Sequence, residues 1–202
     1  MAFSDVATKE RIERTIAALK TNNIEAVVVA DGEVAKAKAL ELIPEGAEVM
    51  TMTSMTLDQI GLAKELNESG RYNASRPKLN ALGHDGGKEK YALGAISDWA
   101  VGSVHAVTED GKVLIASLTG SQLPAYAYSS AHVVWVVGAQ KLVKDLDEAF
   151  QRINEYVLPL ESERAHKAYG VPGSSVDKLL IINKEIMAGR LSMIIIDEAI
   201  GF

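Results

Sequence analysis

The sequence predicts a single α/β domain with a largely parallel sheet. Amphipathic helical segments alternate with short β-branched runs along the chain, and the run at residues 132–137 is apolar on both faces, as expected of a central strand. The apolar fraction of 48% and the charged fraction of 24% are ordinary for a folded protein. With 202 residues the chain is long enough to bury a large core, so we expect one domain over residues 1–202.

The first third of the chain predicts three helices separated by two strands. Ile12, Ile16 and Leu19 lie at helical spacing in the first helix. Thr56 and Gln59 fit a capping box at the start of the third helix. The expected elements are a helix at residues 4–20, a strand at 24–30, a helix at 33–43, a strand at 48–52 and a helix at 57–66.

Glycine and proline interrupt the periodicity in the middle of the chain. Residues 67–87 contain Gly70, Pro77, Gly83 and the pair Gly86-Gly87. We therefore expect a long irregular connection over these residues. A short helix at residues 88–95 is expected to follow.

The second half of the chain predicts mostly strands, with one longer helical stretch. Asp110-Gly111 between two apolar runs is typical of a hairpin, and Pro159 is expected to end the helix that begins after Asp145. The last two strands are expected to complete the same sheet. The expected elements are strands at residues 98–107 and 112–117, a strand at 132–137, helices at 146–157 and 160–169, and strands at 178–182 and 191–196. If residues 121–127 begin a helix, its dipole would favour an anion at the preceding loop.

The composition excludes several kinds of chemistry and partner. The chain has no cysteine and so no disulfide framework, thiolate nucleophile, or cysteine-held zinc or iron–sulfur cluster. Its net charge of −6 and pI near 5.3 argue against nucleic acid and anionic membranes, which attract basic proteins. The first residues lack a secretory pattern and no apolar stretch could span a bilayer, so we expect a cytoplasmic protein.

Two hydroxyl-rich loops are the candidate ligand-binding segments. Thr119, Gly120, Ser121 and Gln122 follow a predicted strand, and their hydroxyl and amide groups suit a carboxylate or phosphate. An ordinary strand-to-helix turn explains the same residues, because neither a Walker loop nor a dinucleotide-binding fingerprint is present. The remaining candidates are Thr53, Ser54 and Thr56, for which helix capping is the alternative, and Lys178, for which it is simple solvation.

Glu109 is the candidate catalytic acid. It precedes a tight glycine turn between two apolar segments, and in a cleft it could act as a nucleophile or base. The alternative is a solvated hairpin tip, because Asp-Gly turns are common.

No metal site is expected from the histidines. Their spacing matches no compact ligand motif, and a hydrogen-bonded core residue is the expectation for the one in an apolar run, His105. The four histidines are His84, His105, His132 and His166.

Several stretches of the sequence form a recognisable set. They are residues 98–111 (DWAVGSVHAVTEDG), 121–124 (SQLP), 136–141 (VVGAQK) and 178–184 (KLLIINK), with Gly201-Phe202 at the end. Together they resemble the LUD domain family, which includes the lactate-utilisation C proteins. The first stretch adds Gly102 and Ser103 to the ligand-binding candidates.

The resemblance implies a three-layer α/β/α fold similar to that of sugar-phosphate isomerases and CoA transferases. It also implies a role in lactate or organic-acid utilisation, with iron–sulfur proteins as partners. CoA transferases carry a nucleophilic glutamate in a Ser-Glu-Asn-Gly motif, which Thr108-Glu109-Asp110-Gly111 resembles. The chain lacks their GxGGF loop, so Gly120-Ser121 would have to replace it.

Three functions are therefore compatible with the sequence. The first is an accessory protein that binds a small carboxylate or phosphate ligand, such as an organic acid or its activated derivative. The second is an enzyme of CoA-transferase type with Glu109 as the nucleophile. In the third, the two loops only stabilise a homodimer. The sequence indicates no particular cofactor.

Overall fold

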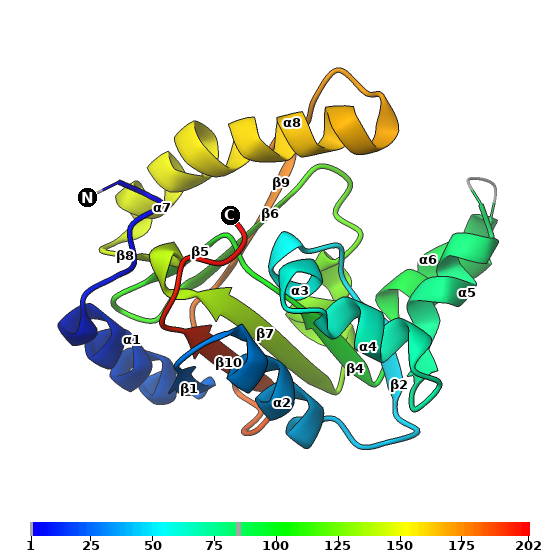
Figure 1. Cartoon of the computed structure of the whole chain (residues 1–202), viewed down its shortest axis with the longest axis horizontal. Helices are drawn as coiled ribbons and strands as arrows, with labels where there is room; N and C mark the ends of the chain where they lie inside the picture. Colours follow the sequence, from blue (N-terminus) through cyan, green and yellow to red (C-terminus); the bar gives the residue numbers. More distant parts are fainter. Residues whose placement is uncertain (1, 84–85) are drawn as a thin grey trace.

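The central sheet has six strands, all parallel to their neighbours, in the order β1-β10-β7-β4-β2-β3. A computed structural model describes residues 2–83 and 86–202 of the chain, so His84 lies outside the described residues. The parallel sheet confirms the predicted fold class, and β7 lies in its interior as predicted (Figure 1). The strands are β1 (Glu25–Val29), β2 (Glu48–Thr51), β3 (Asn73–Ala74), β4 (Trp99–Gly102), β7 (His132–Gly138) and β10 (Leu191–Ile196).

One face of this sheet is covered by helices. Val134 and Val136 of β7 point to this face, where they share a core with Ala39 of α2 and Leu57 of α3. This alternation is what a strand with a two-residue period requires when both of its faces are buried. The covering helices are α2 (Gly32–Leu42), α3 (Met55–Gln59) and α4 (Leu62–Glu68).

The opposite face is covered by one helix and a second sheet. Val133, Trp135 and Val137 point this way and pack in one core with Leu19 and Ile115. The helix is α1 (Lys9–Thr21), and the second sheet has the order β8-β5-β6-β9. Its strands are β5 (Ala106–Thr108), β6 (Val113–Ser117), β8 (Leu142–Val143) and β9 (Lys178–Ile182).

The second sheet corrects two predictions. The single strand expected at residues 98–107 is two strands, because the chain leaves the main sheet after Gly102 and enters the second sheet at Ala106. The strand expected at residues 178–182 forms as β9, but it pairs with β6 and not with the main sheet. The predicted hairpin is confirmed, since β5 and β6 are antiparallel neighbours.

The prediction of an irregular connection at residues 67–87 is wrong for the residues of this stretch that the structure describes, 67–83 and 86–87. This stretch holds the end of α4, strand β3, and helix α5 (Ser75–Ala81), and α6 (Gly87–Ala95) follows. Pro77 is tolerated because it occupies the first turn of α5, where the backbone N–H groups have no partner within the helix.

Pro159 likewise does not end a helix. Helix α7 (Leu146–Arg152) continues through a π-helical turn (Ile153–Val157) into α8 (Leu158–Tyr169). Pro159 lies at the start of α8, directly after the wider turn, where the loss of one backbone donor is least costly.

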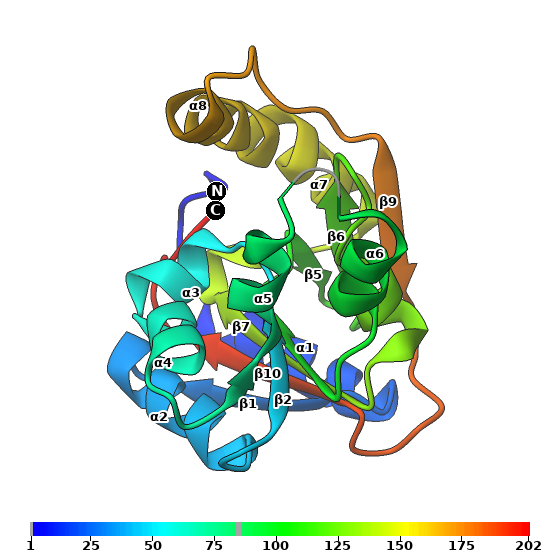
Figure 2. The same cartoon turned by 90° about the vertical axis from the view of Figure 1, so that its right-hand side faces the viewer.

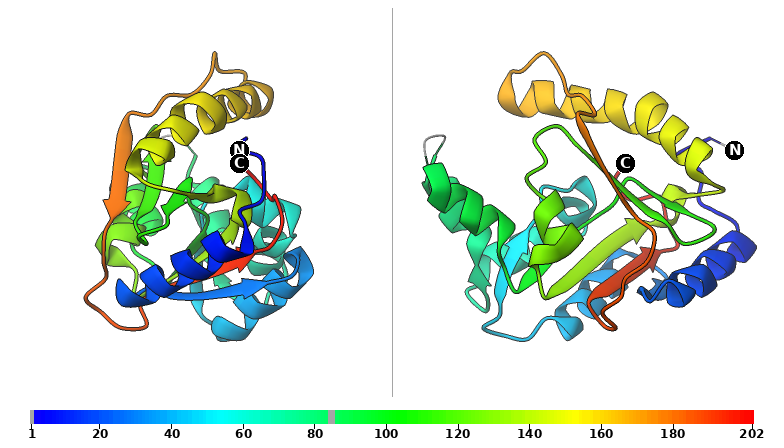
Figure 3. Two further views of the ribbon diagram at one scale, coloured as in Figure 1. Left: turned by 90° about the vertical axis from the view of Figure 1, so that its left-hand side faces the viewer. Right: turned by 180° about the vertical axis from the view of Figure 1, so that it is seen from behind.

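Helix α8 and the main-sheet helices lie on opposite sides of the molecule. In Figures 1 and 2, and in the rear view of Figure 3, α8 lies at the top and α2 at the bottom, with the main sheet between them. The chain then descends from α8 into β9. Among the residues described, no helix is long and apolar enough to cross a membrane.

Candidate functional site

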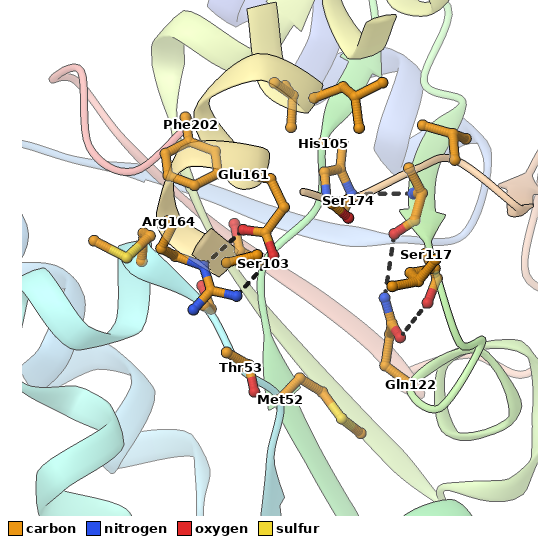
Figure 4. A pocket seen from close by; sticks show the side chains of 18 of the residues that line it. Met52, Thr53, Ser103, His105, Ser117, Gln122, Glu161, Arg164, Ser174 and Phe202 are labelled. Atoms are coloured by element: carbon orange, nitrogen blue, oxygen red, sulfur yellow. Dashed lines mark hydrogen bonds and ion pairs between the residues drawn. The ribbon is translucent and has the colours of Figure 1, made fainter. Parts of the chain in front are cut away.

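A cavity of about 880 Å³ lies where β2 and β4 of the main sheet end, beside the end of β6. Because parallel strands share one carboxyl edge, their following loops meet there. The walls come from the loops after these strands, the turn after β7, helix α8 and the segment before β9. Figure 4 shows Glu161 and Arg164 of α8 on one side and Ser117 and Gln122 on the other.

Lys141 is a buried cation in the wall of this cavity. It lies in a short 3-10 turn after β7, and the residue is only 2% exposed. Its Nζ donates to the Thr56 Oγ1 and the Ser103 Oγ, at 3.1 Å each. Burial is the main reason why the pKa of the amine is lowered to about 7, and the charge of nearby Arg152 acts in the same direction.

Thr56 takes part in this network because another residue caps its helix. The capping box predicted at Thr56 is wrong: Ser54 is the N-cap of α3, and its Oγ accepts from the Leu57 N–H. Thr56 lies inside the first turn, so its hydroxyl is free to turn toward Lys141 and Ser103.

Arg76 is a second cation at the cavity. Its Nε donates to the backbone oxygen of Thr51 at 2.8 Å, and its Nη2 contacts the same oxygen. Burial lowers the pKa of this guanidinium. Within residues 2–83 and 86–202, neither Arg76 nor Lys141 forms an ion pair with a carboxylate.

Arg164, the third cation at the cavity, is already neutralised. Its Nε and Nη2 donate to the two carboxylate oxygens of Glu161, both at 2.7 Å. This fork-to-fork pair raises the pKa of Arg164. The Glu161–Arg164 pair projects into the cavity from α8 and faces Thr53 and Ser103 in Figure 4.

Most of the predicted ligand-binding residues do meet at this cavity. Seven of them line it, namely Thr53, Ser54, Thr56, Ser103, Thr119, Ser121 and Gln122. Gln122 is held in place by two hydrogen bonds, because its Nε2 donates to the Ala116 oxygen and its Oε1 accepts from Ser117. The two predicted loops therefore lie together at this edge of the sheet, and ligand binding by them stays a prediction.

Three other predicted residues lie behind the lining. Gly102 packs against Tyr126, and Gly120 has a positive φ of 84° with the Lys178 side chain in the space that a Cβ atom would need. Lys178 itself donates to the Leu118 oxygen at 3.2 Å. These residues shape the loops, and none of them is part of the cavity wall.

Glu109 lies away from the cavity. The hairpin that contains it precedes β6, whereas the loop with Gly120 and Ser121 follows β6, so the two loops are at opposite ends of one strand. The carboxylate accepts from the Arg11 Nε at 2.7 Å and the Arg14 Nε at 3.0 Å.

The CoA-transferase hypothesis needs Glu109 and Gly120-Ser121 at one pocket, whereas the structure places Glu109 outside the cavity. Its hydrogen bond from Arg14 is the largest of several contacts that lower its pKa, and a carboxylate of low pKa is a weak base and nucleophile.

His105 is a neutral member of the cavity wall. Its Nδ1 accepts a hydrogen bond from the Ala116 N–H at 3.1 Å. Burial lowers its pKa to about 3, with the charges of Lys141 and Arg152 acting in the same direction. Across the described part of the chain, no three acidic, histidine or cysteine side chains are grouped as metal ligands.

A parallel sheet with a polar cavity at its carboxyl edge is the arrangement typical of α/β domains that bind small molecules. The family is also clear from the sequence. The chain belongs to the LUD domain family, whose model matches residues 12–196.

A solved structure of a DUF162 family protein supports the same fold. A DUF162 family protein from Deinococcus radiodurans is similar over 95% of this chain and 99% of its own, with a TM-score of 0.55 and 11% identity. The eIF2B β subunit from Chaetomium thermophilum is similar over 69% of this chain and 48% of its own, with a TM-score of 0.37 and 14% identity. No curated protein matches the sequence.

Proposed function

We propose that this LUD domain binds a small organic carboxylate in the cavity, with Lys141 and Arg76 attracting the anion. The observation that carries the proposal is the contrast between three cations at one site. Arg164 has its own carboxylate partner, whereas Lys141 and Arg76 have none within the described residues. A buried cation without a counter-charge costs free energy, and a bound carboxylate supplies that charge.

The cavity also offers the neutral groups that such a ligand needs. Hydroxyl groups from several loops line it, including those of Thr53, Ser54 and Ser103, and these can donate to carboxylate or hydroxyl oxygens. Its volume of about 880 Å³ falls in the range of small-molecule pockets, roughly 300–1,000 Å³. The site therefore suits an organic acid or a larger derivative of one.

In the cell, we propose an accessory role in lactate or organic-acid utilisation. The family name suggests this role. Because the chain has no cysteine, electron transfer through a cysteine-held iron–sulfur cluster would fall to a partner protein. The contribution of this chain would then be to hold the acid.

A thermal-shift screen tests the proposed binding. Lactate, pyruvate, succinate, citrate, a sugar phosphate and a CoA ester are each added to the purified chain, and a ligand of the native state must raise the melting temperature. We expect at least one carboxylate to do so in a saturable way. The absence of any shift from all of the acids would overturn the proposal.

Three variants locate the binding in the cavity. Lys141→Met should abolish the shift, because it removes an unpaired cation. Arg164→Gln should weaken the shift only modestly, because Glu161 already neutralises that charge. Lys184→Met changes an exposed lysine outside the cavity and should leave the shift unaltered. Equal losses in all three variants would indicate nonspecific anion binding.

A further inference from the structure

We propose that the Lys141 amine forms an imine with the carbonyl carbon of a 2-oxo acid held in this cavity. The inference rests on the proposed function, because it takes the carboxylate of the ligand to be bound there. It adds a chemical class of substrate and a covalent step. The geometry behind it is a primary amine in the wall of a cavity, surrounded by hydroxyl groups and without an acidic partner among the described residues.

The surroundings of Lys141 work against a permanent positive charge. The residue is 2% exposed, and the guanidinium of Arg152 lies close enough to disfavour a second cation. Arg152 is fully buried and donates to the backbone oxygens of His105 and Gln140, so it is fixed behind the amine. With a pKa lowered to about 7, a large fraction of the amine is neutral at physiological pH. A neutral amine is the nucleophilic form of lysine.

The hydrogen-bond partners of Lys141 suit both protonation states of the amine. A hydroxyl group accepts from an ammonium, and it can also donate to the lone pair of a neutral amine. The Thr56 and Ser103 hydroxyls are also within 3.4 Å of each other, which gives a short path for protons around the Nζ atom. A carboxylate in their place would instead hold the lysine charged.

Imine formation between Lys141 and a 2-oxo acid releases one molecule of water. The lone pair of the neutral Nζ attacks the carbonyl carbon, the carbon–oxygen π bond breaks as the carbon–nitrogen bond forms, and one proton passes from the nitrogen to the oxygen to give a carbinolamine. The hydroxyl group then takes up a proton and leaves as water while the nitrogen lone pair forms the carbon–nitrogen double bond, and the nitrogen gives up its second proton, which replaces the one that left with the water. The Ser103 and Thr56 hydroxyls are placed to relay these protons. No oxidant or reductant is consumed.

A second cation fits the carboxylate that a 2-oxo acid carries beside its carbonyl. Arg76 lines the same cavity, and two of its nitrogens share the Thr51 backbone oxygen, which fixes the guanidinium plane. A fixed guanidinium orients a carboxylate better than a mobile one. One anchored end and one reactive amine are what imine formation with a 2-oxo acid requires.

Reductive trapping tests the imine directly. The chain is incubated with pyruvate, glyoxylate or 2-oxoglutarate and sodium cyanoborohydride, and intact-mass spectrometry and peptide mapping follow. With pyruvate we expect one adduct per chain, of the mass of pyruvic acid less one oxygen atom, on the peptide that contains Lys141. Lactate, which has no carbonyl group at that carbon, should give none. The trapping rate should rise through pH 7, whereas an exposed lysine reacts only at higher pH.

Two variants separate covalent chemistry from binding. Lys141→Arg keeps the cation but has no nucleophilic amine, so it should lose the adduct while oxo acids still shift its melting temperature. Lys184→Arg changes an exposed lysine and should still be trapped at Lys141. Ser103→Ala should slow the trapping about tenfold or more without changing the site of modification, as expected when one proton relay is removed.

The two proposals fail in different ways. If oxo acids raise the melting temperature but no adduct appears on Lys141, the imine is excluded and the binding function stands. If adducts are spread over the exposed lysines, or appear equally in Lys141→Arg, the imine is also excluded. If no carboxylate shifts the melting temperature at all, the proposed function itself is overturned.

Discussion

The Tyr126 hydroxyl lies directly against Gly102, in the space that a Cβ atom on this glycine would need. Tyr126 is 1% exposed and packs edge-on against Trp135, so its ring has little room to move. Gly102→Ala should therefore destabilise the chain by about 1–3 kcal/mol, the usual cost of overpacking a core. Urea denaturation measures this loss.

The matched control is Gly94→Ala. This glycine lies in α6, and an added Cβ would meet only ordinary contact at 3.8 Å. Alanine should be neutral there, or stabilising by up to about 1 kcal/mol, because it is the better helix former. Equal effects of the two substitutions would contradict the overpacking at Gly102.

Gly111 and Gly46 share a φ of 81° but differ in their surroundings. A Cβ on Gly111 would lie 2.8 Å from the Ala18 carbonyl carbon in α1, whereas nothing lies within 4 Å of one on Gly46. Gly46→Ala should cost about 1 kcal/mol from backbone strain alone. Gly111→Ala should cost at least twice that amount, because the hairpin must also move away from α1. Urea denaturation measures both losses of stability. A loss for Gly111→Ala that is no larger than that for Gly46→Ala would contradict the close approach of Gly111 to α1.

Glu109 should matter for stability and not for ligand binding. Its two ion pairs join the hairpin to α1, and one partner, Arg14, is largely exposed. Glu109→Gln should therefore lower the free energy of unfolding by about 0.5–2 kcal/mol at pH 7. An added carboxylate ligand should raise the melting temperature of Glu109→Gln by as much as it raises that of the unmodified chain. Loss of binding without loss of stability would restore Glu109 as a functional acid.

The contribution of Glu109 should also fade in acid. Because the folded pKa is lowered, the stabilisation is complete above the unfolded pKa, about 4.3, and is lost as the pH falls through the folded value. The stability gap between the unmodified chain and Glu109→Gln should thus be smaller at pH 3 than at pH 7. A gap that is independent of pH would argue against the ion pairs.

The charge of Lys141 should destabilise the folded chain, whereas that of Glu109 stabilises it. Its folded pKa of about 7 lies below the unfolded value of about 10.4, so the unfolded chain binds more protons between these two values. Stability should then rise with pH over that window, by up to about 1.4 kcal/mol per pH unit. Lys141→Met removes this dependence and should be more stable than the unmodified chain at pH 7, with a difference that shrinks toward pH 10. A constant difference would show that Lys141 is not titrating.

The fold was largely predictable because its signals are local. The β-branched run of β7 and the helical spacing in α1 predicted elements that the structure contains. The second sheet was not predictable in the same way. Nothing local to β9 distinguishes pairing with β6 from pairing with the main sheet, because that choice depends on how the chain turns between Gly102 and Ala106.

The candidate site was predictable in its loops and not in its charges. Hydroxyl-rich loops after predicted strands led to Ser54 and Ser121, and the family resemblance added Ser103; all three line the cavity. Lys141 carried a usable signal, since it closely follows the strongest strand, but a lysine at a strand end is most often solvated. Arg76 and Arg164 carried no such signal. Arg76 lies in α5, which was predicted as an irregular connection, and the sequence did not place helix α8, which carries Arg164, at the edge of the sheet.

The Thr56, Ser103 and Lys141 network joins loops that are at least 38 residues apart in the sequence. Its parts follow β2, β4 and β7, so it exists only once those three strands lie side by side in register. Before that point Lys141 is chemically like any other lysine. An amine-reactive reagent applied briefly at neutral pH should thus mark Lys141 ahead of the other lysines only in correctly folded chains, and the labelled fraction would report the yield of a refolding reaction.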